Sequence, residues 1–261
     1  MSRTLYPLAD GAPEHDSGVG GPFLSWSALC ASAGNLVDAA GVNFGMIYIY
    51  TGAATTGLWR GMIRSAVIFD TSSISSSTTI ISATVKIRGY AKNDGPSLDI
   101  NIYGASTASD STVVAGDFSV IGSTPYCDTP ISYTDWSTSG YNSFVLNTAG
   151  RNAINKGGVT KFGFRNASYD VAGVTPAWPG SNQAAGLFWW AADYGVDTSP
   201  LLVLTTTSNT GTSYYEEGEG LKATDIVTLA AIRNLELTCM GHFRVDKEGN
   251  ARYEDRYYRN G

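Results

Sequence analysis

The fold class is decided by the segment Ile80-Ile81-Ser82-Ala83-Thr84-Val85-Lys86-Ile87-Arg88-Gly89-Tyr90. Within it, apolar residues alternate with polar ones: Ala83, Val85 and Ile87 against Thr84, Lys86 and Arg88. A period of two residues is the pattern of a β-strand with one face buried and the other in water. We therefore predict a half-buried strand over 80–90.

Similar apolar segments flank this strand on both sides, separated by turns rich in Gly, Asn, Asp, Ser and Pro. A single short helix with a glycine stop is expected in 147–158. Many short strands with few helices are typical of a β-sandwich or barrel, so we predict an all-β fold. The further predicted strands are 44–50, 58–69, 98–103, 131–133, 143–147, 160–165, 187–191 and 201–206.

The composition limits the partners of the protein. Its 261 residues are 43% hydrophobic and only 15% charged, with a net charge of −6 and no basic stripe. We therefore expect no direct nucleic-acid partner. No apolar stretch reaches the roughly 18 residues of a membrane span, and Met1-Ser2-Arg3-Thr4-Leu5-Tyr6-Pro7 lacks the apolar run of a signal peptide. These features favour assembly in a host cytoplasm and release by lysis, as for a virion protein.

The composition changes toward the C-terminus. About a third of residues 214–261 are charged, against 15% in the whole chain. We predict a β-sandwich domain over 1–206, a linker over 207–213, and a charged segment over 214–261 with a helix near 221–237 and a hairpin. Such a short segment is too small for a robust core of its own, so it is expected to serve anchoring or assembly. The predicted assembly residues are Phe243, Val245, Tyr253 and Tyr257.

The sequence offers little for catalysis. Its two histidines, His15 and His242, lie near opposite ends, and no HExxH, P-loop or GxSxG motif is present. Most aspartates stand in turns, where they cap their own backbone. We therefore predict that the protein is not an enzyme and has no required cofactor, although loop aspartates leave a calcium ion open. A polysaccharide lyase or hydrolase, with Arg64 or Arg165 beside a tyrosine, is the less favoured alternative.

The three cysteines are Cys30, Cys127 and Cys239, which are far apart in the chain. Their odd number argues against a disulfide framework. We expect them to be small buried hydrophobic side chains in a protein assembled in a reducing compartment.

Aromatic residues suggest a ligand. Trp136, Tyr141, Tyr169 and Trp178 stand in loop-like sequence and are predicted to form a platform on which glycan rings stack. The alternative is that these side chains pack in the core, as tryptophan usually does. In the pair Trp189-Trp190, strand alternation predicts that one ring faces inward.

Two groups of motifs resemble known proteins. The first group consists of Trp59-Arg60-Gly61, Val67-Ile68-Phe69-Asp70-Thr71-Ser72-Ser73-Ile74 and Thr79-Ile80-Ile81-Ser82-Ala83-Thr84-Val85-Lys86-Ile87. It resembles the signature of DNRLRE-type jelly-roll domains, which are related in shape to carbohydrate-binding modules. Ser199-Pro200-Leu201-Leu202-Val203-Leu204-Thr205 is similar to the last strand of that family. The resemblance implies a jelly-roll β-sandwich over 1–206 and assigns no catalytic residue.

The second group points to tailed bacteriophages. The segments 133–147 and 161–171 are similar to a variant of this domain in phage structural proteins. The segment 241–257 resembles part of phage tail proteins, with Asp255 where that pattern has Ser. This resemblance implies a virion component of the tail or capsid decoration, assembled as a homo-oligomer with other virion proteins and binding host cell-surface glycans. A cellular carbohydrate-binding or adhesion module is the alternative.

Overall fold

A computed structural model describes residues 2–18, 22–38, 44–52, 55–93 and 95–207, together with two strands at 241–245 and 251–255. The chain divides into two compact units, Met1–Thr207 and Ser208–Gly261. Each unit is treated separately below.

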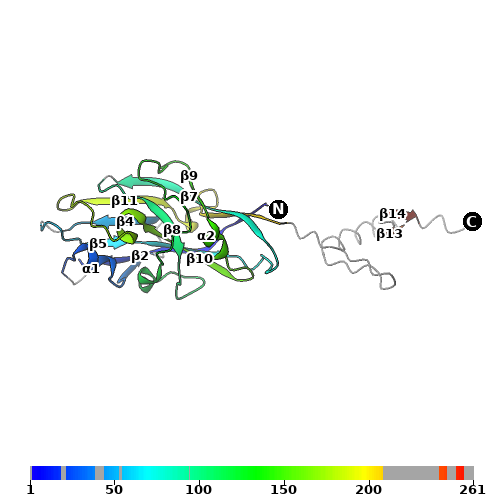
Figure 1. The fold of residues 1–261 in the computed structure, drawn as a ribbon, viewed down its shortest axis with the longest axis horizontal. Helices are drawn as coiled ribbons and strands as arrows, with labels where there is room; N and C mark the ends of the chain where they lie inside the picture. The colour runs from blue at the N-terminus through cyan, green and yellow to red at the C-terminus, as the bar shows by residue number, and fades with distance from the viewer. Residues whose placement is uncertain are drawn as a thin grey trace, which may run out of the picture. The chain divides into compact units, whose positions relative to one another are not determined.

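The first unit is built almost entirely from antiparallel strands, which confirms the predicted all-β class (Figure 1). Short helical turns connect them: α1 (Trp26–Cys30), η1 (Ala115–Val120), α2 (Thr148–Asn152), η2 (Ala167–Val171) and η3 (Ala192–Tyr194). The strands are β1 (Ser2–Leu5), β2 (Pro7–Asp16), β3 (Leu36–Asp38), β4 (Phe44–Tyr50), β5 (Gly61–Ile63), β6 (Ser65–Asp70), β7 (Ile80–Asn93), β8 (Ile100–Gly104), β9 (Tyr141–Val145), β10 (Val159–Asn166), β11 (Ala184–Trp190) and β12 (Leu201–Thr206).

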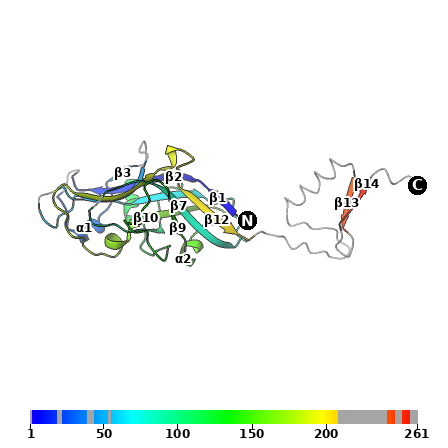
Figure 2. The same ribbon diagram turned by 90° about the horizontal axis from the view of Figure 1, so that it is seen from above.

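These strands form one continuous hydrogen-bonded path in the order β1-β12-β7-β11-β4-β5-β2-β6-β10-β8. Two strands lie off the path, because β3 pairs with β2 and β9 pairs with β7. The first strand lies beside the last strand of the unit, β12, as Figure 2 shows. The N-terminal residues therefore close one edge of the sheet next to the end of the domain.

The long strand β7 organises one layer of the unit. Its first half pairs with β12 and its second half with β11, while β9 pairs along its other edge. Val85 and Ile87 are fully buried, whereas Lys86 and Arg88 lie on the outer face. The alternation predicted for 80–90 is confirmed.

The sheet path folds back on itself and encloses an aromatic core. The ring of Phe144 on β9 lies 5.7 Å from that of Phe164 on β10, and Phe164 lies 5.3 Å from Trp189 on β11. Figure 1 shows β7, β9 and β11 along one side of the unit and β2 and β10 along the other. Residues from both sides meet in the core, which is the arrangement of a β-sandwich.

Several strand predictions need correction. The single strand expected over 58–69 is split into β5 and β6 at Arg64, because the Arg64 side chain turns into the interior. The strand expected at 131–133 is reduced to one isolated bridge between Ile131 and Ile100. The first two strands, β1 and β2, were not predicted.

The second unit contains the hairpin predicted near the C-terminus, as β13 (Gly241–Val245) and β14 (Ala251–Asp255). Phe243 and Tyr253 occupy paired positions, and Val245 pairs with Ala251. The predicted helix near 221–237, Tyr257, Cys239 and nearly all of the predicted linker lie outside the described residues. No helix in the described part of the chain is long and apolar enough to cross a membrane.

Candidate functional site

The structure does not gather the four residues predicted as a glycan platform. Trp136 is 3% exposed and packs on Trp189 in the core, which removes its ring from any platform. Trp178 is partly buried, and its indole N–H donates to the Leu58 carbonyl (3.2 Å). Tyr169 also packs against the core. Of the four, Tyr141 alone lies on the outer face of the sheet.

Three other aromatic side chains meet at the surface instead. The rings of Trp190 and Tyr194 stack, with centroids 3.7 Å apart and planes 23° apart. The ring of Tyr90 lies 4.6 Å from that of Trp190. Tyr90 is 43% exposed and Tyr194 is 47% exposed. We call Tyr90, Trp190 and Tyr194 the aromatic face.

Local structure explains why these rings point outward. Trp189 faces the core with no exposed surface, so its neighbour Trp190 faces the other side of β11. The same alternation along β7 buries Ile87 and Gly89 and turns Tyr90 outward. The turn η3 then brings Tyr194 back over Trp190. The prediction that one ring of Trp189-Trp190 faces inward is confirmed.

Polar groups continue the aromatic face along β7. Arg88 pairs with Tyr141 on β9, and its guanidinium carbon lies 5.9 Å from the centre of the Tyr141 ring. The Tyr141 hydroxyl donates to the carbonyls of Asp197 and Ser199, both at 3.1 Å. Burial raises the pKa of Tyr141, which keeps this donor protonated.

This arrangement offers a ligand both stacking surfaces and hydrogen-bonding groups. The exposed tyrosine rings offer apolar faces to the C–H groups of a pyranose, and their hydroxyls offer hydrogen bonds. Arg88 supplies several donors, while the exposed carboxylates of Asp193 and Asp197 supply acceptors. Both partners that sugar hydroxyls need are therefore present near the rings.

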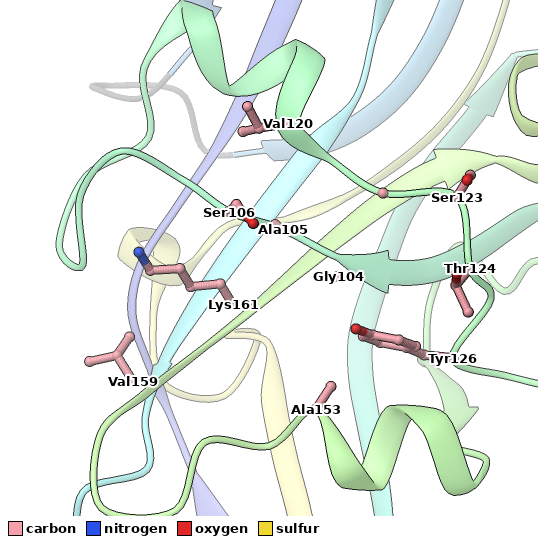
Figure 3. A pocket seen from close by; sticks show the side chains of 11 residues that line it. Gly104, Ala105, Ser106, Val120, Ser123, Thr124, Tyr126, Ala153, Val159 and Lys161 are labelled. Carbon is pink, nitrogen blue, oxygen red and sulfur yellow. The ribbon is translucent and has the colours of Figure 1, made fainter.

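A separate pocket of about 370 Å³ lies at the end of β8 (Figure 3). Lys161 on β10 borders it, and the segment after η1 contributes Tyr126. Figure 3 shows the Tyr126 hydroxyl directed into the space between the backbone at Gly104 and at Ala153. The remaining lining residues are Ala105, Ser106, Val120, Gly122, Ser123, Thr124 and Val159.

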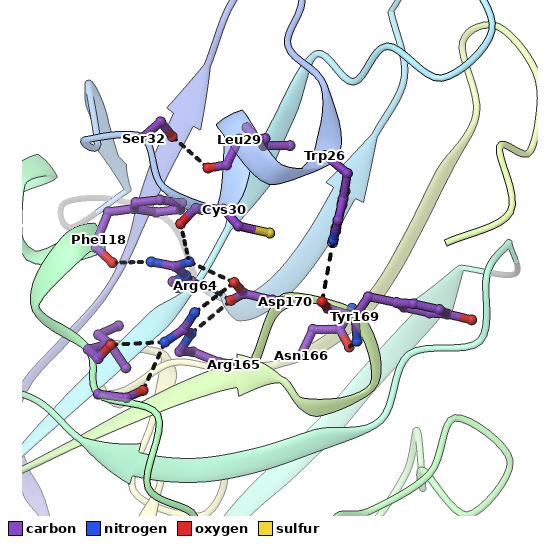
Figure 4. A network of polar contacts seen from close by, with 12 residues as sticks. Trp26, Leu29, Cys30, Ser32, Arg64, Phe118, Arg165, Asn166, Tyr169 and Asp170 are labelled. Carbon is purple, nitrogen blue, oxygen red and sulfur yellow. Dashed lines mark hydrogen bonds and ion pairs between the residues drawn. The ribbon is translucent and has the colours of Figure 1, made fainter. Parts of the chain in front are cut away.

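The two arginines considered for a lyase site are engaged in a buried network (Figure 4). Arg64 and Arg165 each bind the Asp170 carboxylate with two nitrogens, at 2.7 and 2.8 Å in both cases. Arg64 also donates to the carbonyls of Phe118 (2.7 Å) and Cys30 (3.0 Å). The network thus joins Arg64, at the junction of β5 and β6, and Arg165 on β10 to α1, η1 and η2.

Electrostatics fit a structural role for this network. Burial alone would raise the pKa of Asp170, but the hydrogen bonds and charges of Arg165 and Arg64 hold it below its usual range. Burial lowers the pKa of Arg64. The Asp170 side chain has no exposed surface, and its single negative charge offsets part of the positive charge of the two arginines.

The residues Glu14-His15-Asp16 lie at the end of β2. One ring nitrogen of His15 lies 2.7 Å from the Ala33 carbonyl, and Asp16 forms a two-point ion pair with Arg60 at 2.9 Å. Among the described residues, no group of three or more His, Cys, Asp or Glu side chains is placed to hold a metal ion. The possible calcium ion stays an untested prediction.

The described cysteines are Cys30, which is half-buried, and Cys127, which is buried, and both are free thiols. Burial raises the pKa of each to about 12, so both are protonated at neutral pH. Cys127 fits the prediction of a small buried side chain, whereas Cys30 is only partly buried.

Comparison with known proteins adds no assignment. No protein-family model matches the chain, and no curated protein matches it. The case for function therefore depends on the surface chemistry described above and on the sequence motifs.

Proposed function

We propose that the protein is a bacteriophage virion component, of the tail or the capsid decoration, whose β-sandwich binds glycans on the host cell surface without modifying them. The observation that carries the glycan part is the aromatic face. Two exposed tyrosines contact a tryptophan on the outside of the all-β domain.

The aromatic face is suited to bind rather than to react. The Trp190 ring stacks on Tyr194, and the Tyr90 ring also contacts it. Rings that are ordered before binding lose little conformational entropy when a ligand arrives. Arg88 and Asp197 then select among sugars by hydrogen bonds to their hydroxyls.

The virion part of the proposal is supported by the motifs in 133–171 and 241–257. The hairpin of β13 and β14 belongs to the second compact unit, which we propose makes the homo-oligomer and contacts other virion proteins through Phe243, Val245, Tyr253 and Tyr257. Light scattering that finds a monomer at micromolar concentration would count against this assembly. A cellular carbohydrate-binding module would use the same aromatic face in a different location.

A glycan array tests the proposal, with the full-length protein compared with Tyr194→Ala and Tyr194→Phe, in the presence and absence of calcium. We expect specific glycan binding that Tyr194→Ala weakens about tenfold, equivalent to about 1.4 kcal/mol. Tyr194→Phe keeps the ring and should retain most of the binding. Absence of binding to any glycan, or equal binding by Tyr194→Ala and the wild type, would contradict the proposal.

A further inference from the structure

The pocket at the end of β8 presents polar groups that the fold does not use. Four hydroxyls border it, and none of them makes a hydrogen bond to another described residue: Ser106, Ser123, Thr124 and Tyr126. The lining contains one charged side chain, Lys161, and no carboxylate.

The Tyr126 hydroxyl is held in position by the fold. The Tyr126 ring packs edge-on against Phe162, with centroids 6.2 Å apart. Its backbone N–H donates to Ile102 (2.8 Å), and its carbonyl accepts from Asn147 (2.7 Å). A side chain at Gly104 would place a Cβ 2.6 Å from the Tyr126 hydroxyl oxygen, so glycine makes room for this group. The hydroxyl is therefore ordered before any ligand binds.

The Lys161 ammonium is available to a ligand. It donates to the Thr107 carbonyl (2.9 Å) and pairs with Asp110 (2.7 Å). The Asp110 side chain is 71% exposed, and such surface pairs contribute only about 0–1 kcal/mol. Both partners lie outside the pocket lining, and an ammonium has three donors, so one N–H is left for a ligand while both contacts persist.

We propose that this pocket binds a single pyranose that carries one anionic substituent. The four hydroxyls match the ring hydroxyls of a sugar, and Lys161 matches the anion. A volume of about 370 Å³ is near the lower end of the range for small-molecule sites, which suits one sugar residue rather than a long chain. The pocket shares no residue with the aromatic face, so this inference does not depend on the proposed function.

The proposal is tested by isothermal titration of the full-length protein with glucuronate, glucose 6-phosphate and glucose. The first two probes distinguish a carboxylate from a phosphate as the anion, and glucose lacks both. We expect at least one anionic sugar to bind ten times more tightly than glucose. If neither anionic sugar binds more tightly than glucose, the proposal is overturned.

Variants locate the site. Lys161→Met should remove the preference for the anionic sugar, and Tyr126→Phe, which keeps the ring packing, should weaken binding about threefold. Lys156→Met removes an exposed ammonium outside the pocket, whose contact is the Thr78 carbonyl, and should change nothing. Tyr194→Ala should also leave this binding intact, which separates the pocket from the aromatic face. Equal binding by Lys161→Met, Tyr126→Phe and Lys156→Met would refute the assignment.

Discussion

The Asp170 carboxylate shows how a single residue supports the fold. It forms ion pairs with two arginines, Arg64 at the junction of β5 and β6 and Arg165 on β10. Removing one partner of a buried charge group is costly, because it leaves charge without compensation in a medium of low polarity. The sequence named Arg64 and Arg165 as residues of interest but gave no sign that Asp170 lies between them.

Asp170→Asn should therefore be strongly destabilising. We expect a loss of about 3–5 kcal/mol in the free energy of unfolding, because two guanidinium groups stay buried beside a neutral amide. Urea titration measures this loss. Asp135→Asn is the matched control. Asp135 is exposed, and its carboxylate accepts a hydrogen bond from the Ser132 hydroxyl, which in turn accepts one from the Asp135 backbone N–H. A loss below 1 kcal/mol for Asp170→Asn would show that the network does not support the fold.

Asp10 gives the protein a pH dependence. Its carboxylate accepts a hydrogen bond from the Ala192 N–H (2.9 Å), at the start of the turn that carries Tyr194. Burial, with a smaller contribution from the charge of Asp193, raises the pKa of Asp10 from 3.8 to about 6. The folded state therefore holds this proton more tightly than the unfolded state, so the contribution to stability is lost as pH rises from about 4 to about 6.

Asp10→Asn should remove this dependence while keeping an oxygen that accepts from Ala192. At pH 7.5 we expect the variant to be more stable than the wild type by about 2 to 3 kcal/mol, and at pH 4 the two should differ little. Urea unfolding at both pH values measures the difference. The same difference at pH 4 and pH 7.5 would contradict the ionisation of a buried Asp10.

At the scale of strands, the alternation of apolar and polar residues predicted those strands best that have one solvent-exposed face and one buried face. The predicted segment 44–50 coincides with β4, and 80–90 lies within β7. The alternation was not visible in β1, where Ser2, Arg3 and Thr4 are all exposed. The strand over 58–69 was wrong because the sequence cannot show that Arg64 has an acidic partner 106 residues away.

Gly89 marks a point where strand register depends on the absence of a side chain. The pairing of β7 with β11 shifts between Phe188 and Trp189, and Trp189 pairs with Gly89. A Cβ at Gly89 would lie 1.7 Å from the Ser137 carbonyl oxygen, which no rotamer change can relieve. The backbone of one segment would have to move.

Gly89→Ala should therefore lower stability by about 1–3 kcal/mol or more, as overpacked sites do. Gly116→Ala is the control, because a Cβ at that position would meet no atom within 4 Å. Thermal unfolding of both variants compares the sites. If the unfolding temperature of Gly89→Ala equals that of Gly116→Ala, the backbone at Ser137 can move away at no cost in stability, which contradicts this prediction.

At the scale of the whole molecule, the sequence predicted the fold class but not which aromatic residues lie at the surface. Trp136, expected in a glycan platform, belongs to the core, whereas Tyr90, Trp190 and Tyr194 meet on the outside. Loop-like sequence around a tryptophan does not show whether the loop folds inward. The stacking of Tyr194 on Trp190 depends on a turn between two strands, which only the folded chain reveals.

The central claim is that the aromatic face binds glycans, and the indole N–H signals of the six tryptophans test it most directly. Nitrogen-15-labelled full-length protein is titrated with the glycan that binds best on the array, and Trp190→Phe assigns the Trp190 signal. We predict that the Trp190 signal shifts, while those of the buried Trp59, Trp136 and Trp189 stay in place. Saturable binding that leaves Trp190 unmoved would contradict the account and place the glycan elsewhere.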